Sequence, residues 1–174
     1  SASLAFVNGR VDLGGSPNQA VDAARLRTEG EFSKLRVSLS RQQVITSDAS
    51  VHVSHSQQWA NRNLDSSEKF FLGGASGVRA YPSNEAGGTF GRMLNLELRW
   101  RLPEGLGLTL FRDWGRVRQV IGDNASAIPA PNAFSLIGNG ISLAWRAESG
   151  LAFKGTLARR SGANPNPAQN GRDQ

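Results

Sequence analysis

The sequence contains no cysteine among its 174 residues. Disulfide bonds, zinc sites built on thiolates and a cysteine nucleophile are therefore excluded for this chain. Long hydrophobic runs are missing as well: no stretch of 18 apolar residues occurs, and a membrane-spanning helix needs about that length. A membrane-spanning β-barrel stays open, since each of its strands needs only about 10 residues of alternating hydrophobicity.

Histidine is scarce, and the two examples are His52 and His55. Residues three apart on a strand point to opposite faces, so these two cannot bind one metal ion together. A Ser-His-Asp hydrolase would need one of them as its base, and the sequence has no nucleophile elbow. The GGASG run at 73–77 lacks the Lys-Ser/Thr ending of a phosphate-binding loop. We therefore expect no enzyme activity, no cofactor and no metal site.

The net charge is +6, and 17 of the 20 basic residues are arginine. A nucleic-acid-binding protein could have this composition. The arginines are scattered through segments with strand patterns instead of forming one cluster along the sequence, so nucleic acid is not an expected partner.

Seven segments have the alternating hydrophobicity of β-strands. The clearest is RMLNLELRW, in which Leu94, Leu96 and Leu98 alternate with Asn95 and Glu97. A short helical turn is expected at 20–27. The strands are expected at about 2–12, 32–45, 50–60, 91–102, 105–117, 135–147 and 150–160.

The connections between these segments alternate between short and long. Short turns are expected at 46–49, 103–105 and 148–150, and long connections before 31, over 61–90 and over 118–134. Outer-membrane barrels combine short periplasmic turns with long extracellular loops in this way. Trp59, Trp100 and Trp145 lie near strand ends on the apolar side, as an interfacial aromatic belt requires. The prediction is an all-β, antiparallel transmembrane β-barrel; a soluble all-β binding module is the alternative.

Seven strands are an odd number, and the chain ends in a loop-like tail from 161. An open sheet with bare edges cannot persist in lipid. We therefore expect residues 1–174 to be the C-terminal part of one larger barrel domain, with the connection 61–90 inserted into its lumen.

Two carboxylates are expected on the polar face of the hairpin around PEG. With Glu104 at its centre, Glu97 faces Phe111 and Asp113 lies diagonally across. Two acids on one barrel wall need a cation to stay ionised together. Arg99, two residues from Glu97, is one candidate.

Arg79 is the second candidate cation. It lies in the long connection 61–90, whose glycines allow sharp turns, and it could reach Asp113 with two hydrogen bonds. The alternative is that Arg79 is an ordinary exposed loop residue.

Three motifs in this region resemble those of the two-partner secretion transporters, the haemolysin secretion/activation family of the POTRA-bearing outer-membrane barrels. VRAY at 78–81, ELR at 97–99 and FRDWG at 111–115 match the VRGY, ELR and FxDxG motifs of that family. Ala80 departs from the family's usual glycine, and it would be strained if this position required a positive φ.

The resemblance implies a pore of sixteen strands in the outer membrane of a Gram-negative bacterium, preceded by periplasmic POTRA domains. Those domains and the first half of the barrel would lie outside this chain. The implied partners are a secreted exoprotein, such as a haemolysin or adhesin, and outer-membrane lipid. An assembly factor that inserts other barrels is the alternative function within the superfamily.

The resemblance also implies that the long connection is anchored to the barrel wall. The anchor residues would be Arg79, Tyr81, Asp113, Glu97, Phe111 and Gly115. The remaining polar face, with Lys34, Arg36 and Arg101, would let an extended chain pass.

Overall fold

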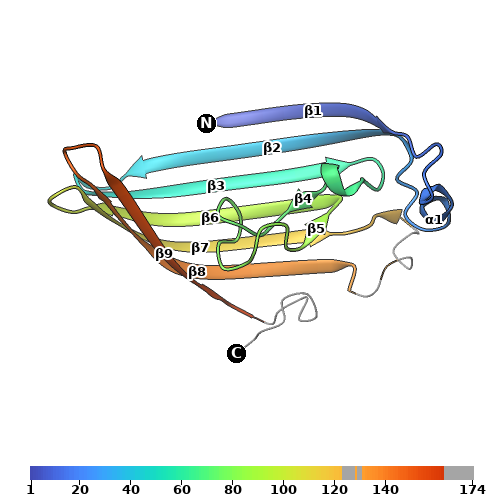
Figure 1. Ribbon diagram of the computed structural model, residues 1–174. Helices are drawn as coiled ribbons and strands as arrows, with labels where there is room; N and C mark the ends of the chain where they lie inside the picture. Colours follow the sequence, from blue (N-terminus) through green and yellow to red (C-terminus); the bar gives the residue numbers. More distant parts are fainter. Residues whose placement is uncertain (123–127, 129–130, 163–174) are drawn as a thin grey trace.

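The seven predicted segments form one antiparallel sheet in the computed structural model, which describes residues 1–122, 128 and 131–162 (Figure 1). The strand order is β1-β2-β3-β6-β7-β8-β9. Observed and predicted bounds differ by at most two residues, so the all-β antiparallel prediction is confirmed. The strands are β1 (Ala2–Val11), β2 (Gly30–Val44), β3 (Ala49–Ala60), β6 (Phe90–Arg101), β7 (Leu106–Arg118), β8 (Ala133–Arg146) and β9 (Ala152–Arg160).

The connections contain the remaining elements. The helix α1 (Gln19–Ala24) lies within the first long connection, close to the predicted turn at 20–27. The connection 61–90 contains a single 3-10 turn, η1 (Ser66–Glu68), and a two-stranded ribbon of β4 (Phe70–Phe71) and β5 (Gly87–Gly88) that the sequence did not predict. No helix in the described part of the chain is long and apolar enough to cross a membrane, a finding that has no bearing on spans made of strands. Parts of the predicted connection 118–134 and of the tail after 161 lie outside the described residues.

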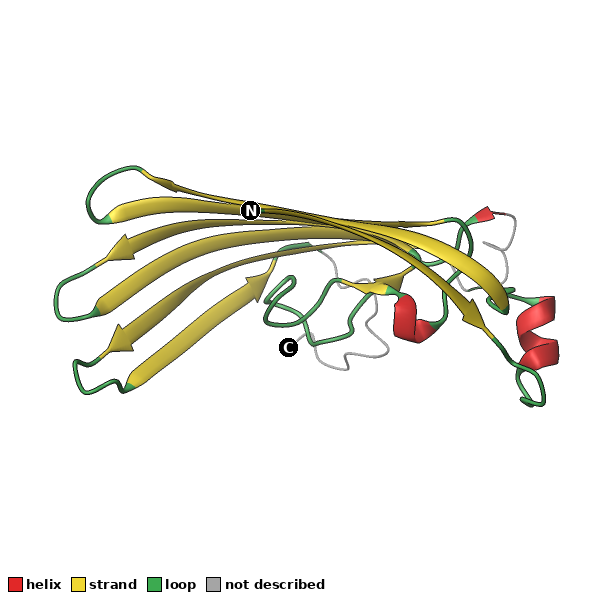
Figure 2. Cartoon of the chain, turned by 90° about the horizontal axis from the view of Figure 1, so that it is seen from above, coloured by secondary structure: helices red, strands yellow, loops and turns green. Residues whose placement is uncertain are grey.

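The two faces of the sheet differ sharply in polarity. The outer face exposes its leucines: Leu96 is 45%, Leu143 51% and Leu157 76% exposed. The inner face carries Gln58 and Asp113, which are completely buried under the connection 61–90. Figure 2 shows this connection lying against the concave side of the sheet. The outer face therefore needs apolar surroundings that the described part of the chain does not supply.

The apolar stretch on the outer face shifts along the strands from one edge of the sheet to the other. On β1 it is centred on Leu4, in the hydrogen-bonded row that also contains Ser135 of β8. On β9 it runs from Phe153 to Leu157 and is centred in the row of Leu143. At 3.4 Å per residue and 4.8 Å between neighbouring strands, the centre of the apolar stretch moves about 27 Å along the strands over a distance of about 29 Å across the sheet. A level apolar band across strands tilted about 35–45° gives such a slope.

If the outer face contacts lipid, two neighbouring substitutions should have unequal costs. In the full-length protein, Leu143→Arg would then destabilise the folded barrel by about 2–4 kcal/mol, because a guanidinium would replace a leucine in lipid. Ala144→Arg, on the inner face, is expected to cost much less. The temperature at which each variant loses its compact form on a denaturing gel measures the difference. Equal losses would contradict the assignment of this face to lipid.

Candidate functional site

The tip of the connection 61–90 is a tight turn that aims Arg79 at the sheet. Gly74 has a φ of +101°, a conformation that residues with side chains rarely adopt. A Cβ on Gly77 would lie 2.0 Å from the Leu72 carbonyl oxygen, which accepts a hydrogen bond from the Val78 N–H. Ala80 is not among the described residues with positive φ, so alanine at this position carries no left-handed backbone strain.

Arg79 binds Asp113 through both its side chain and its backbone. Its Nε donates to Asp113 Oδ2 at 2.8 Å, its Nη2 to Oδ1 at 2.7 Å, and its backbone N–H to Oδ2 at 3.0 Å. The Phe111 ring lies against the guanidinium, with 3.6 Å from Cζ to the ring centroid. Burial alone would lower the pKa of Arg79, but the hydrogen bonds and charges of Asp113 and then Glu97 raise it above its ordinary value. The guanidinium therefore stays charged while it is enclosed.

Glu97 accepts hydrogen bonds from both candidate cations. Its Oε1 accepts from Arg79 Nη1 at 2.6 Å, and its Oε2 accepts from Arg99 Nε at 2.6 Å. The hairpin register places Glu97 opposite Phe111, as the turn around Glu104 predicts. Both candidate cations thus share this carboxylate, and Arg79 is not the exposed loop residue of the alternative interpretation.

Tyr81 and Gly115 hold the connection in place through packing. Tyr81 is buried in an apolar cluster with Leu72 and Val78 of the connection and with Val117 of the sheet. Gly115 leaves room for the same cluster, because a Cβ there would lie 2.5 Å from Leu72 Cδ2. These two residues shape the apolar seat on which the charged tip rests.

Asn95 and Arg160 also contact the tip, and the sequence did not identify either. Asn95 Nδ2 donates to Asp113 Oδ1 at 2.8 Å and to the Gly77 carbonyl at 3.0 Å. Arg160 Nε donates to the Ala80 carbonyl at 3.3 Å, and its guanidinium lies over the ring of Tyr81. The register already held the signal for Asn95, since it pairs directly with Asp113.

A second group of contacts fixes the base of the connection to β2 and β3. Lys34 is buried and forms an ion pair with Glu68, and Gln58 donates to the carbonyls of Glu68 at 3.2 Å and Thr89 at 3.3 Å. Arg36 is tied to the same group through its hydrogen bond to Gln58 at 2.6 Å. The prediction that Lys34 lines an open passage is therefore wrong, because the connection covers it.

The site holds charges in place and offers no free acid or base pair of its own. Both carboxylates are occupied by guanidinium groups. His52 pairs with Glu97 on the inner face and His55 with Leu94 on the outer face, so their rings lie on opposite sides of the sheet. The described residues contain no group of three or more side chains able to hold a metal ion.

Comparison with known proteins gives one family and two sets of relatives. The model of the family "Haemolysin secretion/activation protein ShlB/FhaC/HecB" matches residues 1–144. The heme/hemopexin transporter protein HuxB of Haemophilus influenzae strain 86-028NP is 25% identical over 135 residues, which cover 75% of this chain and 24% of HuxB. HuxB of strain Rd is 30% identical over 91 residues, which cover 50% of this chain and 16% of HuxB.

A solved structure, CdiB from Acinetobacter baumannii, is also similar to the chain. The TM-score is 0.48 at 16% sequence identity, and the match covers 75% of this chain and 28% of CdiB. The chain spans about a quarter of the length of HuxB of strain 86-028NP.

Removal of the Arg79 side chain is expected to release the tip. Arg79→Ala would leave the buried Asp113 charge without its guanidinium, a loss of about 3–5 kcal/mol. Chymotrypsin, which does not cut at arginine, should then cleave the full-length protein faster after Phe71 or Tyr81. The control is Arg101→Ala, because Arg101 hydrogen-bonds Ser47 in an exposed turn. Equal cleavage rates in Arg79→Ala and the unmodified protein would show that Arg79 does not hold the tip.

The close packing of Leu72 over Gly115 gives a second prediction, in which a double variant restores part of what the single variants lose. Gly115→Ala would overpack the buried Leu72 side chain and cost about 1–3 kcal/mol. Leu72→Ala on its own would leave a cavity and cost about 2–5 kcal/mol. The double variant is expected to be cleaved more slowly than additive costs imply, because each change relieves the other. Strictly additive cleavage would contradict the packing of Leu72 over Gly115.

Proposed function

This chain belongs to the haemolysin secretion/activation protein family, and we propose that the whole protein secretes a partner exoprotein across the outer membrane of a Gram-negative bacterium. Residues 1–174 would be the C-terminal part of a sixteen-stranded barrel. POTRA domains and the remaining strands would complete the protein. The family match over residues 1–144 and the exposed apolar outer face support this proposal.

The proposed mechanism rests on one observation: the Arg79–Asp113 ion pair is buried between the connection 61–90 and the sheet. The inner face of the sheet would be the wall of the secretion pore. The connection would then lie inside the pore and narrow it. Because the ion pair fixes the tip against one wall, the rest of the lumen stays available to an extended polypeptide.

The six predicted site residues would fix the tip to the wall in two ways, through charge and through packing. Arg79 would be the anchor, and Asp113 and Glu97 its partners on the wall. The Phe111 ring would stack against the guanidinium of Arg79. Tyr81 and Gly115 would position the turn, so that the charged contact re-forms in one geometry each time it opens.

The function is tested by measuring secretion of an exoprotein, with the product of a neighbouring gene as the first candidate. Arg79→Ala and Asp113→Ala are expected to reduce secretion about tenfold or more, a change of about 1.4 kcal/mol or larger. The amount of protein in the outer membrane should stay the same, because the strand ladder does not depend on the tip. Arg41→Ala serves as the control and should secrete normally, because Arg41 lies on the outer face of the sheet, away from the connection.

Other outcomes separate the alternatives. Normal secretion by both variants would contradict the anchor role. Absence of exoprotein secretion from cells with the unmodified protein would contradict the function itself. If other outer-membrane barrels were depleted when the gene is deleted, while the exoprotein was still secreted, the protein would be an assembly factor.

A further inference from the structure

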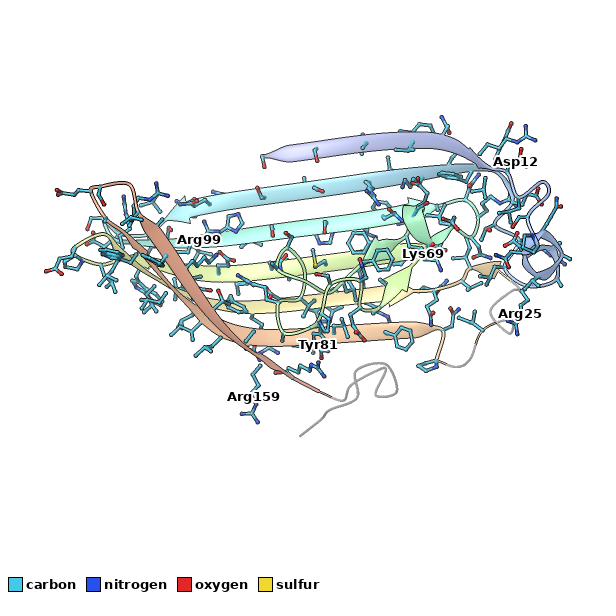
Figure 3. The ribbon with its side chains drawn as sticks, in the orientation of Figure 1. Asp12, Arg25, Lys69, Tyr81, Arg99 and Arg159 are labelled. Carbon is cyan, nitrogen blue, oxygen red and sulfur yellow. The ribbon has the colours of Figure 1, made fainter. Side chains whose placement is uncertain are left out.

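Five arginines lie on the outer face of the sheet, towards the end that carries the long connections. The group, called here the arginine cluster, consists of Arg92, Arg112, Arg116, Arg118 and Arg159. All five side chains are exposed, and Figure 3 shows Arg159 pointing away from the strands. On β6 to β9, which the structure describes in full, the outer face carries no aspartate or glutamate. The cluster is therefore a patch of one charge sign.

On β7 and β9 the cluster begins where the apolar band ends. Arg112 and Arg159 lie in one hydrogen-bonded row, on either side of Asn139. The next row towards the short turns contains Leu110, Ile141 and Leu157, which are all exposed. On the outer face of its strand, each of these two arginines is thus the next residue after an apolar one. This boundary is the position of the headgroup layer for a sheet embedded in lipid.

The charges of the cluster are not balanced within the described part of the chain. Arg92 and Arg116 are direct cross-strand partners, an arrangement in which like charges repel. The ion pairs formed among the described residues involve other cations: Lys34, Arg79 and Arg99. An anion from outside the sheet would relieve the repulsion.

We propose that the arginine cluster binds the phosphate groups of glycolipid headgroups in the outer leaflet of the outer membrane. The inference rests on the proposed function, because it takes the long connections to face the cell exterior. A guanidinium can bind one phosphate through two parallel hydrogen bonds, and its long stem can lie along apolar surface.

A tryptophan within the cluster fits the same location. Trp114 lies between Arg112 and Arg116 on the outer side of β7, and the Arg92 guanidinium lies 5.1 Å from its ring centroid. Tryptophan rings are enriched at the level of lipid headgroups. The cluster thus combines cations for phosphate with a ring suited to the interface.

The other edge of the sheet supplies a matched control. At the same end of the outer face, Arg10 of β1 pairs in register with Glu31 of β2. The sheet therefore offers this arginine an acid, which the cluster lacks. Lipid binding should depend on β6 to β9 and be independent of Arg10.

The test uses the full-length protein in detergent, with diphosphorylated lipid A as the probe and native mass spectrometry as the readout. The triple variant Arg112→Gln, Arg116→Gln, Arg159→Gln is expected to bind lipid A roughly tenfold or more weakly, because several charged hydrogen bonds are lost. The matching triple lysine variant should retain part of the affinity, since it keeps the charge but loses the paired geometry. Arg10→Gln should bind like the unmodified protein.

Three results would overturn the inference: equal binding by the unmodified protein and the glutamine variant, equal binding of dephosphorylated lipid A, or displacement by inorganic phosphate, which would indicate a free-anion site. A failure of the proposed function looks different. The unmodified protein would then be absent from the outer membrane, or the exoprotein would not be secreted. Failure of this inference alone leaves membrane insertion and secretion intact.

Discussion

A carboxylate without access to solvent organises this part of the molecule. Asp113 projects from β7 onto the inner face, where its oxygens accept three hydrogen bonds from Arg79 and one from Asn95. An isolated charge in such a place costs several kcal/mol, so Asp113 strongly favours the arrangement in which the connection 61–90 lies against the sheet. The apolar seat of Leu72 and Tyr81 and the second carboxylate, Glu97, are arranged around this one contact.

The sheet and the charged centre of the site could be predicted because both follow from local patterns. Alternation marks each strand, and the short turn around Glu104 allows one register for its hairpin. That register places Glu97 opposite Phe111 and Asn95 opposite Asp113. The same pairing that predicts the two acids on one face thus also identifies Asn95 as a partner of Asp113.

The remaining contacts could not be predicted because they depend on how the connection 61–90 lies over distant strands. Arg160 and Ala80 are 80 residues apart, and no spacing rule links them. The alternation on β2 assigned Lys34 to the polar face correctly, but it could not show that Glu68 covers this residue. The ribbon of β4 and β5 has two residues per strand, which is too short to give a periodic signal.

That ribbon changes how the charged contact forms. Pairing of Phe70–Phe71 with Gly87–Gly88 closes the connection near its base, and only about fifteen residues remain between the two strands. Arg79 is then confined to a small volume around Asp113, at an effective concentration of roughly millimolar or above. Contact between the two is thus an intramolecular event, and a tip that came loose would find Asp113 again without a long-range search.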